Sequence, residues 1–248
     1  MRIVATIEAR LNSKRLPKKH LYKINGKLII NILIERLKKI KSLTKIVLST
    51  TNNKIDDELV KIAKKNKIGF YRGSEDNVLE RVTKSARKYS ADAILQISGD
   101  CPLIDYSLVS YQIEMFKLNN PDVSTPYWFN FPGGVCAPII KVSALQKSLK
   151  NSKTTSDYEH VTNYIFNNQK KFKILYFLAT NSLKYPNIEF ILDTYDDFLF
   201  LKKIMKFDIQ NCFTTTQLID ICKKKRILRK KKIIRKNKDR KKFIINSL

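Results

Sequence analysis

The feature that most constrains the fold of this chain is a regular alternation of short apolar runs and amphipathic stretches over its first hundred residues. The apolar runs predict strands, and the stretches between them repeat apolar side chains at the 3.6-residue period of a helix. The expected strands cover 3–7, 45–50, 68–71 and 93–98, and the expected helices cover 27–41, 56–66 and 77–89. Repeated β-α units of this kind predict an α/β fold with a mainly parallel sheet and helices on both faces.

The second half of the chain is patterned less regularly. Four prolines and the pair Gly133-Gly134 interrupt residues 121–138, which predicts a loop-rich segment. Beyond it we expect helices at 141–149, 156–167 and 194–207, a short helix from Thr214, and strands at 172–177 and 188–192. The interpretation is one α/β domain over residues 1–222, with a small inserted lobe at about 121–175, followed by a basic tail at 223–248.

The formal net charge of +27 raises the question of a polyanionic partner. Residues 223–242 contain 14 basic side chains and one acidic one, so 13 of these charges lie in the tail. No aromatic residue separates the basic ones, so only salt-sensitive backbone contacts remain for nucleic acid. Nucleic-acid binding through the tail and an amphipathic helix on anionic lipid stay as alternatives. We favour a solvated terminus and do not expect nucleic acid as a partner.

Cysteine usage and hydropathy exclude several other classes of protein. The four cysteines have only two histidines for company and no CxxC spacing, which argues against a zinc cluster and indicates reduced thiols. The apolar run at 3–7 is too short for a signal peptide, and charged residues interrupt every apolar run well short of a membrane span. We therefore expect a soluble, cytoplasmic protein.

Polar residues follow three of the expected strands, at the edge where parallel α/β sheets bind ligands. The loop after strand 3–7 concentrates cations and one hydroxyl: Arg10, Ser13, Lys14, Arg15, Lys18 and Lys19. The roughly four negative charges of a nucleoside triphosphate require such a set of fork-shaped and point cations. The loop has neither the GxxxxGK[ST] nor the GxGxxG pattern, and a solvated basic loop is the alternative explanation.

The other two strand ends each carry a carboxylate. Asp100 follows strand 93–98, and Gly99 beside it lets the backbone approach a ligand closely. Asp193 follows strand 188–192. Two such carboxylates suit a hard divalent cation such as Mg²⁺, which binds through one or two carboxylates plus substrate phosphates. Capping of the helices that follow is the alternative for both residues.

In this order the segments resemble the cytidylyltransferases of the CMP-sugar type, in particular those of spore coat polysaccharide biosynthesis, with 3-deoxy-manno-octulosonate and acylneuraminate cytidylyltransferases as relatives. The likeness runs to about Lys206 and is strongest over the first 105 residues. The family signature R-x-x-S-x-R-L-P-x-K-x-L is present as Arg10, Ser13, Arg15-Leu16-Pro17, Lys19 and Leu21. Segments that begin at Arg72, Ser98, Glu159 and Leu192 match further family motifs in the same order.

The resemblance implies a Rossmann-like, GT-A-like nucleotide-diphospho-sugar transferase fold, which is a three-layer sandwich. It implies an enzyme that transfers CMP from CTP to an acidic sugar of the 2-keto-3-deoxy or nonulosonic type, with release of pyrophosphate, for surface polysaccharide biosynthesis. The expected cofactor is Mg²⁺. Relatives often dimerise through the inserted lobe, so a homodimer is a further expectation.

The resemblance also implies a role for each matching residue. Arg10, Ser13, Arg15 and Lys19 would hold the triphosphate, and Arg72, Ser74, Asp76 and Asn77 would lie near the base and ribose. Asp100 and Asp193 would bind Mg²⁺, and Glu159 and His160 would face the sugar. Arg10, Lys19 and Asp100 would be the catalytic residues.

Some positions depart from the family pattern. Lys18 takes the place of the glycine that usually precedes the signature lysine, Asn77 replaces an aspartate and Tyr195 a proline. Residues 132–138 differ more, since relatives often carry acidic residues there, and this segment bears on the choice of sugar. The rival enzyme class is a glycosyltransferase, which usually shows an Asp-x-Asp pair; here Cys101 and Pro102 follow Asp100.

Overall fold

The computed structural model describes residues 1–128 and 130–227, and the part of the basic tail beyond residue 227 lies outside them. In these residues one seven-stranded sheet forms the centre of the fold, in the order β5-β4-β1-β6-β8-β7-β9. The strands are β1 (Ile3–Glu8), β4 (Lys45–Thr51), β5 (Gly69–Gly73), β6 (Ala93–Ser98), β7 (Val123–Pro126), β8 (Ile139–Lys141) and β9 (Ile174–Phe177). A small hairpin pairs β2 (Lys23–Ile24) with β3 (Lys27–Leu28).

The sheet is mostly parallel, as the alternation of elements predicts. Strands β5, β4, β1 and β6 all pair in parallel, while β8 lies antiparallel between β6 and β7. Strand β7 pairs in parallel with the edge strand β9. In register, Glu8 at the end of β1 lies opposite Ser49 of β4 and Ser98 of β6. The carboxyl ends of these strands therefore form one edge of the sheet.

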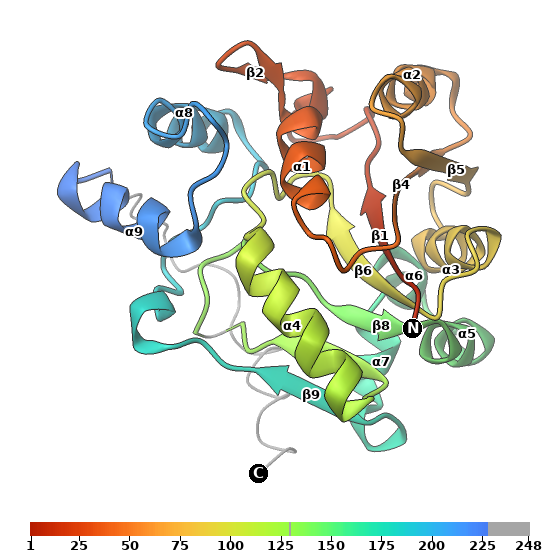
Figure 1. Ribbon diagram of the computed structural model, residues 1–248. Helices are drawn as coiled ribbons and strands as arrows, with labels where there is room; N and C mark the ends of the chain where they lie inside the picture. The colour runs from red at the N-terminus through yellow and green to blue at the C-terminus, as the bar shows by residue number, and fades with distance from the viewer. Residues whose placement is uncertain (129, 228–248) are drawn as a thin grey trace.

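Helices cover both faces of the sheet and complete the three-layer sandwich (Figure 1). One face packs against α1 (Ile29–Lys38), α2 (Asp57–Lys65) and α4 (Tyr106–Asn119). The other packs against α3 (Val78–Lys88), α5 (Val142–Asn151) and α7 (Asn163–Asn167). The described residues also form four short 3₁₀ helices: η1 (Lys19–Leu21), η2 (Lys54–Asp56), η3 (Gln169–Lys171) and η4 (Asn181–Leu183).

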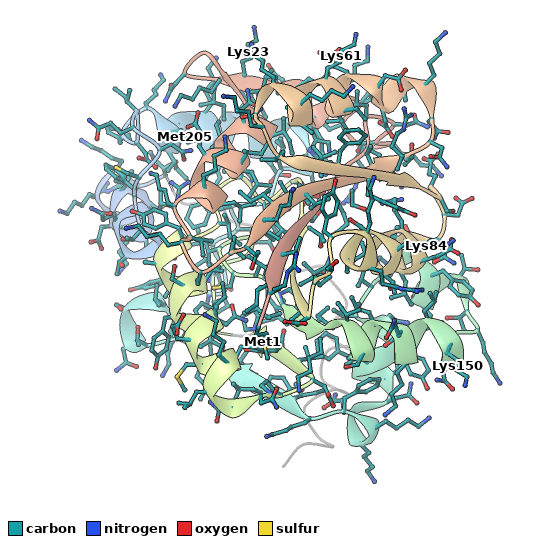
Figure 2. All side chains as sticks on the ribbon, turned by 45° about the vertical axis from the view of Figure 1, so that its right-hand side comes forward. Met1, Lys23, Lys61, Lys84, Lys150 and Met205 are labelled. Atoms are coloured by element: carbon teal, nitrogen blue, oxygen red, sulfur yellow. The ribbon has the colours of Figure 1, made fainter. Side chains whose placement is uncertain are left out.

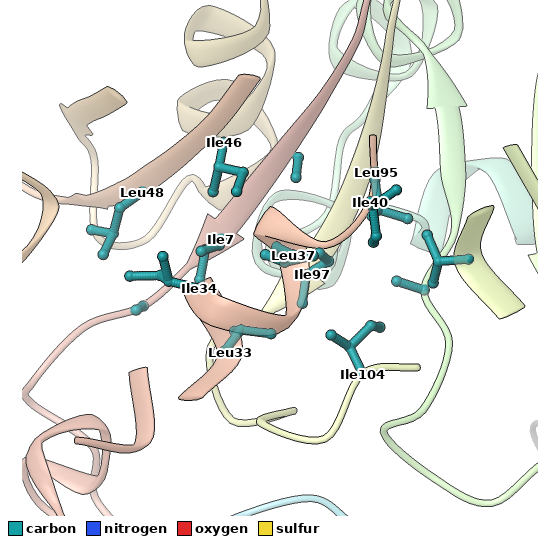
Figure 3. Packing of buried hydrophobic residues seen from close by; sticks show 14 of the residues in the cluster. Ile7, Leu33, Ile34, Leu37, Ile40, Ile46, Leu48, Leu95, Ile97 and Ile104 are labelled. Atoms are coloured by element: carbon teal, nitrogen blue, oxygen red, sulfur yellow. The ribbon is translucent and has the colours of Figure 1, made fainter. Parts of the chain in front are cut away.

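The alternation of side chains along each strand explains this layering. In β1, Ile3, Ala5 and Ile7 point to the α1 face, and Leu95 and Ile97 of β6 do the same. Figure 3 shows Leu33, Ile34 and Leu37 of α1 packed against the strands that carry Ile7, Leu95 and Ile97. All of them are essentially inaccessible to water, so their burial stabilises the contact between helix and sheet.

Two further helices pack near the N-terminal end of α1. Helices α8 (Tyr195–Met205) and α9 (Thr215–Lys224) belong to a second apolar cluster, which includes Ile29 and Ile32 of α1. A fully buried guanidinium links these parts: Arg36 donates to Asp208 Oδ2 and to Asn211 Oδ1, each at 2.6 Å. The segment between α8 and α9 is thereby fixed to α1.

Two predictions about local structure were wrong. Residues 188–192 form no strand, because their backbone meets the loop at Gly133 in a single bridge rather than a ladder. The helix expected over 156–167 is two short helices, α6 (Thr155–Glu159) and α7, separated by a turn at 160–162. The segment 121–138 is loop-rich as predicted, although it contains the short strand β7. Strands β7, β8 and β9 extend the same central sheet, and the lobe boundary stays a prediction.

Most lysines of the described chain lie at its surface, with Lys19 as a buried exception. Figure 2 shows Lys23, Lys61, Lys84 and Lys150 at the periphery of the molecule, and all four are exposed. Within residues 1–128 and 130–227, none of the helices combines the length and apolar character needed to cross a bilayer.

Candidate active site

A cleft of about 500 Å³ opens at the carboxyl ends of β1 and β6. Its walls come from the loop after β1, from the first turns of α3, and from the turn between α6 and α7. Among the residues that line it are all four predicted triphosphate ligands, one predicted metal ligand and both predicted sugar contacts: Arg10, Ser13, Arg15, Lys19, Asp100, Glu159 and His160. The structure therefore brings segments that are far apart in the sequence to one edge of the sheet.

The loop after β1 is held in place by its own backbone. The Leu11 N–H donates to Asp56 Oδ1 at 2.7 Å, and the Lys18 N–H donates to the Leu11 carbonyl at 2.9 Å. Lys18 closes the loop in the left-handed conformation, with φ of 54°. Glycine adopts this conformation at no steric cost, which explains why a glycine is usual here in the resembling family. The turn delivers Lys19 into the buried start of η1.

Lys19 joins the two predicted metal ligands. Its ammonium lies 2.7 Å from Asp100 Oδ2 and 3.1 Å from Asp193 Oδ1, and these three side chains are only 9%, 17% and 11% exposed. Arg15 forms a fork on the second carboxylate, with contacts of 3.0 and 3.1 Å to Asp193. Burial alone raises the pKa of Asp100, but the charge and hydrogen bond of Lys19, with further help from Ser98, hold that pKa below its ordinary value.

Neither aspartate caps the helix that follows it. Helix α4 is capped by Asp105, whose carboxylate accepts from the Ser107 and Leu108 N–H groups. Helix α8 is capped by Thr194, in a capping box with Asp197. The alternative explanation for Asp100 and Asp193 is therefore wrong.

The chemistry of this pair fits a hard divalent cation. Among the described residues, no three His, Cys, Asp or Glu side chains gather in a cluster that could hold a metal alone. Two carboxylates with room for substrate phosphates are the ligand set that Mg²⁺ prefers. The Leu192 N–H donates to the Asp100 carbonyl at 2.8 Å, and this bond aligns the two segments that carry the carboxylates.

Beneath the cations lies a buried group that sequence reasoning missed. Glu8 lines the cleft at the end of β1 and accepts a hydrogen bond from Gln96 of β6. Burial raises the pKa of Glu8 to about 8, although Gln96 and Arg81 act in the opposite direction. Burial also lowers the pKa of Arg81, which enters the cleft from α3. The sequence signal for Glu8 was its position directly after the expected strand 3–7, at the same edge of the sheet as the basic loop.

His20 and Gly99 pack tightly behind Lys19. His20 Nδ1 lies 3.2 Å from the Gly99 carbonyl oxygen, and burial, with Lys19 next, lowers the pKa of His20 to about 4. The imidazole is therefore neutral at physiological pH. A Cβ at Gly99 would lie 3.0 Å from both Ala9 Cβ and His20 Cε1, so any larger residue would require these neighbours to shift.

The four residues predicted near the base do not line this cleft. Arg72 donates to the carbonyls of Thr51 and Asn53 and pairs with Asp57, so its guanidinium fastens the end of β4. Ser74 Oγ accepts from the Asn77 N–H, and Asn77 Oδ1 accepts from the Glu80 N–H to cap α3. Asp76 is exposed. Their nucleotide contacts stay predictions. Arg10, by contrast, reaches Glu75 of this segment at 3.3 Å from within the cleft.

A second, smaller compartment of about 280 Å³ adjoins the cleft. The two share Gln96 and Ser98 of β6 and Thr162 of the turn between α6 and α7. Its walls include Trp128 and Phe131, together with Gly133, Gly134 and Cys136 of the segment that departs from the family pattern. Sequence reasoning placed the choice of sugar in this part of the chain but gave no picture of a pocket.

Comparison with known proteins agrees with this geometry. Residues 4–238 match the sequence model of the cytidylyltransferase family. An uncharacterized protein of Methanocaldococcus jannaschii is 38% identical over 226 residues, which are 90% of this chain and 91% of that protein. The spore coat polysaccharide biosynthesis protein SpsF of Bacillus subtilis is 27% identical over 207 residues, 82% of this chain and 85% of that protein.

A solved structure extends the likeness to three dimensions. A cytidylyltransferase from Leptospira borgpetersenii shares the fold with a TM-score of 0.89 at 29% identity, covering 94% of this chain and 99% of that one. The resemblance read from the motifs is thus confirmed over nearly the whole sequence. The chain belongs to the cytidylyltransferase family of CTP-dependent nucleotidyltransferases.

Proposed function

We propose that this enzyme transfers CMP from CTP to a hydroxyl group of an acidic sugar and releases pyrophosphate. The observation that carries the proposal is that Arg10, Arg15, Lys19 and Asp100 line one cleft, where Lys19 contacts Asp100 and both Lys19 and Arg15 contact Asp193. The cations match a triphosphate, and the carboxylates match the divalent cation that accompanies it.

In the proposed reaction the sugar oxygen forms a bond to the α-phosphorus as the bond from that phosphorus to the bridging oxygen of pyrophosphate breaks. The protein contributes position and charge rather than covalent chemistry. Arg10, Arg15 and Lys19 neutralise the leaving pyrophosphate, and each well-aimed cation contributes about 2–4 kcal/mol to the transition state. Mg²⁺, held by Asp100 and Asp193, would polarise the α-phosphate when bound.

The sugar is proposed to enter from the side of α6. Glu159 and His160 lie at the end of this helix, line the cleft and are exposed, so both are free to meet a second substrate. The family resemblance supports an acidic sugar, whose carboxylate would lie among the cations of the cleft. The name of the Bacillus subtilis relative supports a place in surface polysaccharide biosynthesis.

The test is release of pyrophosphate from CTP and Mg²⁺ with a panel of sugar acids, comparing the native enzyme with Asp100→Asn. We expect turnover with at least one 2-keto-3-deoxy acid, and a loss of roughly 100-fold or more in kcat in the variant. Lys23→Met, an exposed change outside the cleft, is the matched control and should retain full turnover. Full turnover of Asp100→Asn with normal Mg²⁺ dependence would refute the role of this carboxylate.

A further inference from the structure

Exposed apolar side chains gather on α8 and on the loop that follows it. Among the described residues nine large apolar side chains are exposed, and four of these lie within residues 195–209. They are Tyr195, Leu199, Phe207 and Ile209, which are 56%, 40%, 43% and 71% exposed. Single apolar residues are common on protein surfaces, whereas a group of them indicates a contact with a partner.

The periodicity of α8 places these residues opposite the core. The helix buries Phe198, Leu201 and Ile204 in the second apolar cluster. The exposed side chains of the other face follow one another at helical spacing: Tyr195, Leu199, Lys202, Lys203 and Lys206. Tyr195 is one of the positions that depart from the family pattern. The outer face is therefore apolar in its first half and basic toward its end.

The charge around this face is positive. Over residues 195–227 seven exposed cations are accompanied by two exposed carboxylates, those of Asp196 and Asp220. Helices α8 and α9 lie together at one side of the molecule (Figure 1). The Lys225 ammonium lies 5.6 Å from the centre of the Phe207 ring, which brings the basic end of α9 to the apolar loop. The remaining sequence, residues 228–248, adds ten basic residues and one acidic one.

This combination of side chains favours one kind of partner. A two-fold contact with a second copy of the chain would place the lysines of one α8 against those of the other, which opposes such a contact. Leu199 and Ile209 have no ring on which a nucleic-acid base could stack. Apolar side chains bordered by lysines are the features that bind a helix in the plane of an anionic membrane surface.

We propose that the outer face of α8 and the loop after it dock on an anionic lipid surface. Leu199, Phe207 and Ile209 enter the boundary between headgroups and acyl chains, and the lysines of α8 contact lipid phosphates. Lysine suits this place because its long stem can lie along apolar surface while its ammonium stays at the headgroups. The contact is peripheral, and it is independent of the chemistry proposed for the cleft.

The test is sedimentation of the full chain with vesicles of phosphatidylcholine, alone or with about one third phosphatidylglycerol. We expect partition onto the anionic vesicles to be at least about tenfold stronger and to fall as the salt concentration rises. Changing Lys202, Lys203 and Lys206 together to glutamine should weaken partition roughly 100-fold, at about fivefold per lysine. Leu199→Gln combined with Ile209→Gln should weaken it at least about tenfold, because less apolar surface is buried.

Matched controls change the same kinds of residue elsewhere on the surface. The triple change of Lys61, Lys64 and Lys65 of α2 to glutamine, and the pair Leu118→Gln with Leu178→Gln, alter exposed side chains only. Each should change partition less than about threefold. In Ile209→Trp the tryptophan emission should shift to shorter wavelength on anionic vesicles, and in Leu118→Trp it should not.

Three results would overturn the inference. One is failure to bind anionic vesicles, or equal partition onto both kinds of vesicle. Another is an equal loss in the α2 and α8 lysine variants, which would assign binding to the charge of the whole chain. The last is full binding by Leu199→Gln with Ile209→Gln, because contact through charge alone indicates a polyanion such as an acidic protein or a nucleic acid.

Discussion

Replacing Lys19 with methionine separates the two proposed roles of Asp100 and Asp193, which are to pair with Lys19 and to bind a divalent cation. In the described structure the Lys19 ammonium contacts both Asp100 and Asp193, the two carboxylates that would hold a divalent cation. Methionine keeps an unbranched side chain that is one heavy atom shorter, and it removes the charge. In the variant, the negative charges of two buried carboxylates are less well neutralised. A bound metal ion can supply the positive charge that Lys19 no longer provides.

The expected magnitude follows from the burial of the three side chains. Breaking a fully buried ion pair costs about 3–5 kcal/mol of folding free energy. Arg15 still contacts Asp193, and Asp100 is 17% exposed, so we expect a loss of about 2–3 kcal/mol here. For a chain of this size that lowers Tm by roughly 4–12 °C. A metal ion at ten times its Kd restores about 1.4 kcal/mol.

The assay is thermal unfolding of both proteins without nucleotide, with and without Mg²⁺ or Mn²⁺. We expect the metal to raise the Tm of Lys19→Met by at least twice as much as that of the native enzyme, because Lys19 no longer competes for the carboxylates. The exposed variant Lys23→Met should respond as the native enzyme does. An equal metal response in Lys19→Met and the native protein would refute this account of the cluster.

Three further predictions concern groups that the structure brought to light. In Glu8→Gln, the gain in Tm over the native protein should grow from pH 5 to pH 8, because Glu8 with its pKa of about 8 keeps its proton in the folded state while the unfolded chain loses it near 4.5; parallel pH profiles contradict this. Arg36→Met should lose about 3–5 kcal/mol in a denaturant titration, since Asp208 stays buried without its cation, whereas a loss below about 1 kcal/mol contradicts a structural role. Gly99→Ala should lower Tm through an overpacking cost of about 1–3 kcal/mol and weaken turnover, and an unchanged protein would show that the contact with His20 yields easily.

The first half of the fold was predictable from sequence because its signals are local. Strand β6 has the predicted ends, and β1 and β4 run only one residue further, since each is an apolar run bounded by polar residues. The second half was harder. Strands β7 and β8 are short neighbours that pair antiparallel. A segment of three or four residues is too short to show the alternation of apolar and polar side chains that predicts a strand.

The site was predictable where residues follow strands and much less so elsewhere. Asp193 reaches Lys19 although residues 188–192 form no strand. Isolated backbone hydrogen bonds to Gly133 and Asp100 hold this segment beside the sheet in place of a regular ladder. Glu8 and Arg81 were not predicted as site residues, because their shifted pKa values depend on burial, and burial cannot be read from the residue type alone. The small compartment depends on the contact between residues 131–138 and 186–191, and such long-range packing has no local pattern.

The most direct test of the central claim is calorimetric binding of CTP, UTP, ATP and GTP, each with and without Mg²⁺. We expect selective binding of CTP, strengthened by Mg²⁺ and weakened roughly 10- to 100-fold in Lys19→Met through loss of a charge-assisted contact to phosphate. Binding of another triphosphate in preference to CTP, or of none, would contradict the assignment of this cleft as the site of cytidylyl transfer.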